Sequence, residues 1–221
     1  KFNSYWNKAP NVKGANEHTL FEDSMTRDII AYICLQYFFM RDMSLFGGFI
    51  RAHYSGKPWS DMDVMMPTHM HTTEELKRLF GHMKTFVSMI LNIPKYHMTY
   101  AIHSFTSNYG CSVDFKVQCT DRDNVLIKID IAHDKLPKRR NILLPPTVGS
   151  SLQMMANGVV KLRSCPLINS RLSQWNVTDI IDLLKDGKDI KLCKNNSGDE
   201  LYRAYYWSRM TKITACKWEL I

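Results

Sequence analysis

The chain has 221 residues, enough for one large domain or two small ones with a buried core. Hydrophobic residues make up 45% and charged residues 23%, a composition that excludes a disordered or fibrous chain. The formal net charge of +8 favours a polyanionic partner, above all nucleic acid, because lysine and arginine neutralise phosphates. Solubility alone is the other explanation of this charge.

The sequence predicts a soluble, intracellular and therefore cytoplasmic protein that does not enter a membrane. Its most apolar stretch, residues 29–40, is shorter than the roughly 20 residues that cross a bilayer. Residues 1–14 lack the apolar centre of a signal peptide. The six cysteines contain no C-x-x-C pair, so we expect reduced thiols and neither a zinc site nor a disulfide framework.

Hydrophobic periodicity predicts helices and strands in the first two thirds of the chain. The strongest pattern is the capping box Thr72-Thr73-Glu74-Glu75, which is followed by apolar residues at helical spacing. Near the end of this region, two strand-like runs joined by a turn-like segment predict an antiparallel hairpin. In chain order, we expect an extended arm (1–16), a helix (24–40), a strand with a double glycine (43–50), a loop (54–58), a strand (61–65), a helix (73–91) and three strands (96–105, 112–119, 125–132).

The composition changes after Pro145-Pro146, and we place a boundary near residue 147. Beyond it we expect a strand at 158–162, a helix at 177–185 that ends at Gly187, and a helix at 199–213. The predicted fold class is α+β, a mixed sheet flanked by helices with a smaller, mostly helical C-terminal portion. The predicted parts are an N-terminal arm (1–16), a main domain (17–147) and a C-terminal portion (148–221).

The most informative stretch is residues 46–65, FGGFIRAHYSGKPWSDMDVM. Residues i and i+2 of a strand point to the same face, so Asp61 and Asp63 should project together. Met62 and Val64 would then face the core. Two carboxylates this close repel each other unless a cation lies between them, and Mg²⁺ prefers oxygen ligands. The pattern therefore predicts a magnesium site at this strand.

A two-metal site requires a third carboxylate. Asp130 is a single acid inside the apolar run at 129–132, where an unpaired charge is costly unless it binds a metal or a partner. We therefore predict Asp130 as the third acid. Asp114 has the same local pattern on the preceding predicted strand and is the alternative.

The residues before the two aspartates suit the binding of a triphosphate. Gly47 and Gly48 lack side chains, so the backbone can turn sharply and bring its N–H groups against phosphate oxygens. Arg51 and Lys57 can neutralise phosphate charge. Ser60 either contacts a phosphate or only shapes the entry to the strand.

Taken in order, these features resemble the DNA polymerase beta-like nucleotidyltransferase superfamily. Its signature is Gly-Gly or Gly-Ser at a strand end, a spacer, Asp-x-Asp, and a third acid on a later strand. The stretch is most similar to the head domain of tRNA nucleotidyltransferases and bacterial poly(A) polymerases, where G-G-x-V-R-D precedes D-x-D. Residues 47–51 correspond to the start of that motif, whereas Ala52 stands where the family has aspartate.

The resemblance covers residues 24–134, about half of the chain. The C-terminal part, with Arg209, Met210 and Lys212, is similar to nucleotidyltransferase-like proteins of large DNA viruses. The resemblance implies that residues 17–147 form the catalytic domain.

The resemblance also implies a reaction, in which a nucleoside monophosphate passes from a nucleoside triphosphate such as ATP to an acceptor hydroxyl and pyrophosphate is released. The implied cofactor is Mg²⁺, with Mn²⁺ as an alternative, held by the catalytic residues Asp61, Asp63 and Asp130. The positive charge favours the 3′-end of RNA or DNA as acceptor. Two alternatives stay open: a protein or small-molecule acceptor, and a non-catalytic nucleic-acid-binding module with the same fold. The oligomeric state stays open too.

Overall fold

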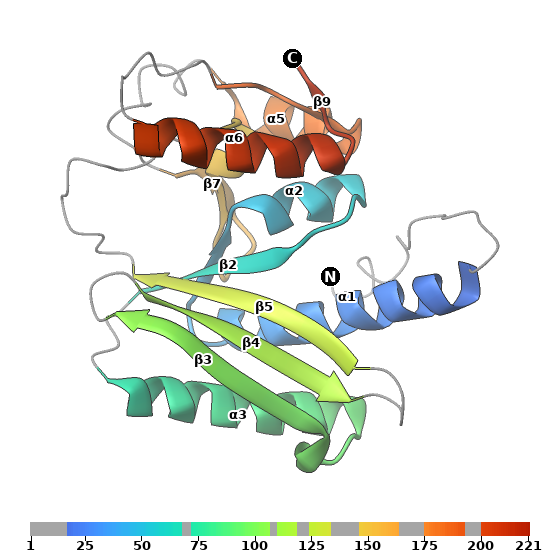
Figure 1. The fold of residues 1–221 in the computed structure, drawn as a ribbon, viewed down its shortest axis with the longest axis vertical. Helices are drawn as coiled ribbons and strands as arrows, with labels where there is room; N and C mark the ends of the chain where they lie inside the picture. The colour runs from blue at the N-terminus through green and yellow to red at the C-terminus, as the bar shows by residue number, and fades with distance from the viewer. Residues whose placement is uncertain are drawn as a thin grey trace. The chain divides into compact units, whose positions relative to one another are not determined.

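The computed structural model describes residues 17–67, 72–106, 110–118, 124–133, 146–163, 175–192 and 200–221. Within these residues there are five α-helices and a mixed sheet of seven strands (Figure 1), which confirms the predicted α+β class. The chain divides into two compact units that interleave along the sequence. Unit 1 comprises Lys1–Leu45, Asp61–Pro137 and Met155–Asn157, and unit 2 comprises Phe46–Ser60, Lys138–Met154 and Gly158–Ile221.

Unit 1 contains two long helices and most of the sheet. The last two strands form the predicted antiparallel hairpin, and the first acid-bearing strand runs parallel to the final one. The elements are α1 (Glu17–Phe39), β1 (Ser44–Phe46, which ends at the start of unit 2), β2 (Asp61–Met66), α3 (Thr73–Leu91), a 3₁₀ turn (Lys95–His97), β3 (Met98–Thr106), β4 (Gly110–Gln118) and β5 (Asn124–His133).

Helices α1 and α3 cover one face of the unit 1 strands, which Figure 1 shows in front of both helices. Alternate strand residues point into this interface, as the period of two requires. Met62, Phe115 and Ile129 are fully buried there, and Phe38 of α1 meets Phe80 of α3 edge to face at 6.4 Å. The opposite face of the strands carries the polar residues.

Unit 2 consists of short elements around two antiparallel strands and a parallel pair. They are α2 (Gly48–Ser55), a 3₁₀ turn (Gly149–Ser151), β6 (Leu152–Met154), β7 (Val160–Leu162), α5 (Val177–Lys185), β8 (Lys188–Asp189), α6 (Glu200–Ala215) and β9 (Glu219–Leu220). The order of the large sheet is β3-β4-β5-β2-β1-β6-β7, and β8 pairs with β9.

Most predicted elements are confirmed, with small shifts at their ends. The α3 bounds and its capping box agree with the prediction, since Thr72 accepts from the Glu75 N–H and Glu75 accepts from the Thr72 N–H. Helix α1 begins at Glu17, before the predicted Ser24. The short strands β6, β8 and β9 were not predicted, because two or three residues carry too little periodicity. The predicted arm at 1–16 lies outside the described residues.

The predicted strand at 43–50 is wrong in its second half. β1 ends at Phe46, and residues from Gly48 onward form helix α2. Gly47 takes φ 78° and ψ −149°, a conformation that glycine alone adopts readily and that ends the strand. Phe49 and Ile50 suggested a strand because they are adjacent and apolar, yet they lie on the buried side of a helix that extends into the first two residues of the predicted loop and ends at Ser55.

Candidate active site

The D-x-D pair lies on β2 as predicted, with both aspartates on one face. Asp61 and Asp63 are half-buried, whereas Met62 and Val64 are fully buried against the helices. The alternation follows from the strand period of two. The two carboxylates therefore project from the face that α1 and α3 do not cover.

Asp130 of β5 is the register partner of Asp63 on the parallel neighbour β2. Neighbouring strands lie about 4.8 Å apart, and paired residues point to the same face. Asp130 is half-buried and its neighbours Ile129 and Ile131 are buried, so its carboxylate stands on the polar face with the other two. The structure thus places the three predicted acids on the same face of two adjacent strands.

Basic side chains compensate part of this negative charge. Lys128 is exposed and is the register partner of Asp61. Arg27 of α1 donates from Nε to the Leu126 carbonyl at 3.2 Å. Burial lowers the pKa of Arg27, while Asp28 and Asp61 oppose that shift, so Arg27 and Asp61 lie close enough to interact electrostatically.

The field of Asp130 also reaches the buried face of β4. Burial raises the pKa of the Cys111 thiol to about 12, and the negative charge of Asp130 adds to this shift. Cys111 is 7% exposed and stays a neutral thiol at physiological pH. It is therefore a residue of the core.

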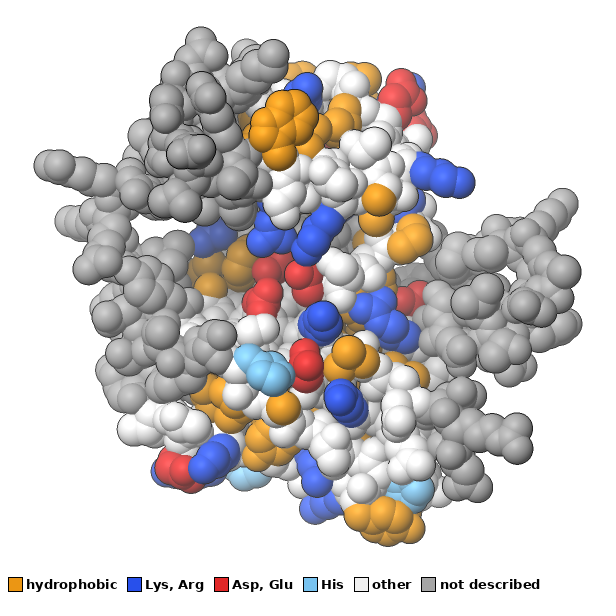
Figure 2. Space-filling model, in the orientation of Figure 1, with side chains coloured by type: hydrophobic (Ala, Val, Ile, Leu, Met, Phe, Trp, Pro, Cys, Tyr) orange, Lys and Arg blue, Asp and Glu red, His pale blue; other side chains and the backbone are white. Residues whose placement is uncertain are grey.

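Asp114, the alternative third acid, lies on the same polar face but one strand further away. Its register partner is Lys128 on β5, and its Oδ2 lies 3.4 Å from Nε2 of His103. Asp130 lies on β5, the neighbour of β2, whereas Asp114 lies on β4, which is separated from β2 by β5. Position therefore favours Asp130 as the third member of the group. Figure 2 shows acidic, basic and histidine side chains together over these strands.

The donor set on the polar face suits a hard cation, since it consists of carboxylate oxygens. In the described part of the chain, no three His, Cys, Asp or Glu side chains converge tightly enough to hold a metal ion as they stand. The backbone positions fit the group: Asp63 and Asp130 are lateral neighbours, and Asp61 is two residues along the same strand.

In unit 2, Gly47 and Gly48 form the entry to α2. Gly47 is the N-cap residue and provides no side-chain acceptor, so the first-turn N–H groups of α2 lack a side-chain cap. A Cβ on Gly48 would lie 3.3 Å from Nη2 of Arg51. The guanidinium therefore lies beside a helix N-terminus, an arrangement that attracts anions.

Arg51 also contacts a buried acid that the sequence analysis missed. Its Nη1 donates to Thr147 Oγ1 at 3.3 Å and lies 3.4 Å from Asp189 Oδ2. Asp189 is 1% exposed and accepts from the N–H groups of Gly149 and Ile190, each at 2.8 Å. Burial raises the pKa of Asp189, and Arg51 is the first of the groups that oppose that rise. No apolar run marks Asp189 in the sequence, because it lies between Lys188 and Ile190 in a charged stretch, so only the tertiary structure identifies it.

Lys57 lies against the C-terminal residues of unit 2. Its Nζ donates to the Lys217 carbonyl and lies 4.9 Å from the centre of the Trp218 ring, and the Arg51 guanidinium lies 5.6 Å from the same ring. Ser60 is exposed. Arg51 and Lys57 thus have structural contacts within unit 2, and their role in nucleotide binding stays a prediction.

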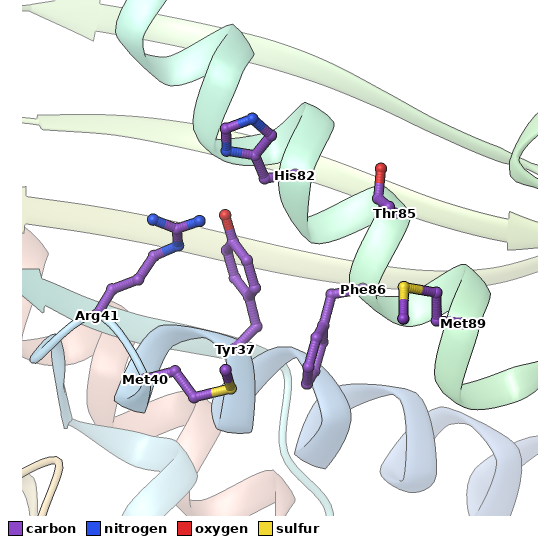
Figure 3. A pocket seen from close by; sticks show the side chains of 7 residues that line it. All are labelled: Tyr37, Met40, Arg41, His82, Thr85, Phe86 and Met89. Atoms are coloured by element: carbon purple, nitrogen blue, oxygen red, sulfur yellow. The ribbon is translucent and has the colours of Figure 1, made fainter.

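A separate pocket of about 460 Å³ lies between α1 and α3 of unit 1 (Figure 3). Tyr37 lies at its centre, buried, and donates to the Leu79 carbonyl at 2.8 Å. The Arg41 guanidinium lies 4.5 Å from the Tyr37 ring centre. The lining contains no carboxylate, so this pocket offers no magnesium ligands; it is lined by Tyr37, Met40, Arg41, His82, Thr85, Phe86 and Met89.

Among the described helices, none is both long and apolar enough to cross a membrane.

Comparison with protein families and with curated proteins finds no match. Among solved structures, the chain is similar to JHP933 from Helicobacter pylori, at 14% identity and a TM-score of 0.42, over 73% of this chain and 65% of that one. It is similar to the CCA-adding enzyme with CTP (13% identity, TM-score 0.43, 86% of this chain and 39% of that one). It is also similar to the CCA-adding enzyme with ATP (11%, 0.41, 89% and 40%). The chain thus spans less than two thirds of the length of each.

Proposed function

We propose that this chain is a metal-dependent nucleotidyltransferase, which transfers a nucleoside monophosphate from a nucleoside triphosphate to an acceptor hydroxyl and releases pyrophosphate. The observation that carries the proposal is the register of Asp63 with Asp130 on parallel strands, with Asp61 two residues away on the same face. Three carboxylates on one half-exposed face repel each other. A divalent cation bound between the carboxylates would neutralise that repulsion and could assist phosphoryl transfer.

Mg²⁺, or Mn²⁺ in its place, would be held by Asp61, Asp63 and Asp130, since both ions accept carboxylate oxygens. When bound, the ion neutralises triphosphate charge and makes the acceptor hydroxyl more acidic. In the proposed step, the acceptor oxygen bonds to the α-phosphorus and the bond from that phosphorus to the bridging oxygen breaks. Asp130 takes the hydroxyl proton, and pyrophosphate leaves.

We further propose that Gly47 and Gly48 bind the triphosphate through backbone N–H groups. Support comes from the uncapped α2 N-terminus and from the position of Arg51 Nη2 beside Gly48. A guanidinium has five donor hydrogens, so the contacts of Nη1 with Thr147 and Asp189 leave donors on Nη2 for phosphate. Lys57 and Ser60 are the remaining proposed nucleotide-binding residues, Lys57 by charge and Ser60 by its hydroxyl.

The favoured acceptor is a nucleic-acid 3′-end, because the net charge of +8 attracts polyanions. The test is incubation with α-labelled nucleotides, Mg²⁺ and three acceptor classes: RNA or DNA oligonucleotides, a protein mixture, and aminoglycosides. Label should move to an oligonucleotide. Label on protein or aminoglycoside would keep the enzyme class and replace the acceptor.

The site itself is tested by Asp61→Asn, Asp63→Asn and Asp130→Asn in the same assay. Asp179→Asn is the matched control, because Asp179 is an exposed aspartate on α5 of unit 2. Transfer should be lost in the three site variants and kept in the control. Transfer that survives all three substitutions would refute the proposed site. Binding of nucleotide without transfer in the unchanged chain would instead support a non-catalytic module.

A further inference from the structure

A row of polar residues crosses unit 1 from the proposed metal site to the edge of the sheet. The register pairs Asp63 with Asp130, Asp130 with Ser112, and Ser112 with His103. Register partners on adjacent strands share a face, so these four side chains form one line across β2, β5, β4 and β3. Steps of about 4.8 Å between strands place Ser112 about 5 Å and His103 about 10 Å from Asp130, measured along the sheet.

The far end of this row is an imidazole positioned by a carboxylate. His103 Nε2 lies 3.4 Å from Asp114 Oδ2, and the side chains are 51% and 28% exposed. Asp114 faces Lys128 on its other side. The carboxylate of Asp114 thus lies between two basic groups. Its contact with His103 Nε2 can orient the imidazole ring.

We infer that Ser112 and His103 bind the backbone phosphate next to the terminal hydroxyl of a nucleic-acid acceptor, with Asp114 as a positioning residue. This inference rests on the proposed function and narrows its acceptor. Serine hydroxyls are typical phosphate ligands, and an imidazole N–H is a donor of the same kind. Both residues lie in line with Asp130, which would take the acceptor's proton. A nucleic-acid strand whose terminal hydroxyl lies at Asp130 would then extend over Ser112 on β4 and His103 on β3.

The charge pattern along the row agrees with this orientation. The acids Asp61, Asp63 and Asp130 lie at the β2–β5 end, where a cation and the reacting hydroxyl are expected. The donors lie at the β4–β3 end, and exposed Lys116 projects from the same face of β4. A cationic aminoglycoside would meet donors at this end, so the row discriminates against it.

The test separates acceptor binding from the chemical step. Ser112→Ala and His103→Gln are compared with the unchanged chain for transfer of label to an oligonucleotide and for transfer to water, which releases the free nucleoside monophosphate. His82→Gln is the matched control, because His82 is an exposed histidine on α3, in the layer behind the sheet. Oligoribonucleotide and oligodeoxyribonucleotide of the same sequence are used in parallel.

We expect His103→Gln to raise KM for the oligonucleotide roughly tenfold, the usual effect of losing a hydrogen bond to a charged group. Asp114→Asn should raise it less, and Ser112→Ala by a few-fold. KM for the nucleotide and the rate of transfer to water should stay unchanged.

Two results would overturn the inference. In the first, His103→Gln and Ser112→Ala leave KM for both oligonucleotides unchanged. In the second, transfer to water falls as much as transfer to the oligonucleotide, which indicates only a structural role. Equilibrium binding of a fluorescein-labelled oligonucleotide without nucleotide is measured as well. This binding measurement does not depend on catalysis. If Asp63→Asn leaves transfer intact, the proposed function fails, but weaker oligonucleotide binding by His103→Gln would still support the inference.

Discussion

Asp130 in unit 1 and Asp189 in unit 2 both lie on strands, β5 and β8, and each is followed by an isoleucine. In the structure their surroundings differ. Asp189 is 1% exposed and is surrounded by two backbone N–H donors and the Arg51 guanidinium. Asp130 is half-buried and lies beside another carboxylate. A buried acid whose oxygens accept hydrogen bonds stabilises the folded state. An acid placed beside other acids lowers stability through charge repulsion, which points to a bound cation.

The largest expected effect on stability comes from replacing the buried acid, Asp189. Asp189→Ala removes the acceptor for the Gly149 and Ile190 N–H groups and leaves Arg51 without its carboxylate. Removing one partner of a buried pair costs about 3–5 kcal/mol. Urea unfolding should show that loss. Asp182→Ala, at an exposed pair with Lys185, should cost less than about 1 kcal/mol. Equal losses in the two variants would contradict the role assigned to Asp189.

For the half-buried acids Asp63 and Asp130 we expect a loss of activity with little loss of stability. Asp63→Asn and Asp130→Asn should lower label transfer by at least roughly 100-fold, since even the outer partners of metal ligands cost 10- to 100-fold. Their unfolding free energy should stay within about 1 kcal/mol of the unchanged chain, because each change removes a repulsion. A large loss of stability in either variant would mean that the carboxylates serve the fold.

The pH dependence of stability sharpens the contrast. Burial raises the pKa of Asp189 above its ordinary value, so the folded state binds the proton more tightly than the unfolded chain does. The contribution of Asp189 is therefore greatest below its unfolded pKa of about 3.9 and declines as pH rises through the folded pKa. Urea unfolding from about pH 3.5 upward should show the unchanged chain losing stability relative to Asp189→Asn. If the unchanged chain instead gained stability relative to Asp189→Asn as pH rises, the sign would be reversed and this account excluded.

The smallest effect tests whether the two units unfold separately. Thr72→Ala removes the α3 cap in unit 1 and should cost about 1 kcal/mol. If the units are independent, Thr72→Ala and Asp189→Ala will shift different transitions in a thermal scan. One shared transition, shifted by both substitutions, would show that the units unfold together.

Helix α3, the β4–β5 hairpin and helix α5 follow from local sequence. A capping box, alternating apolar residues and a helical stripe specify an element without reference to distant residues. The alternation on β2 likewise predicted that Asp61 and Asp63 share a face. The strand predicted at 43–50 failed because Phe49 and Ile50 fit either period, and only the positive φ of Gly47 decides where the strand ends.

The sequence by itself determined which residue types carry the chemistry: two aspartates with a shared face, a further acid in an apolar run, and a double glycine before them. Tertiary structure decided which acid joins the pair. Parallel pairing of β5 with β2 puts Asp130 beside Asp63, and Asp114, with the same local pattern, lies one strand beyond and faces His103. The physical reason is that strand order and register depend on long-range pairing, whereas the period of two is a property of each strand alone.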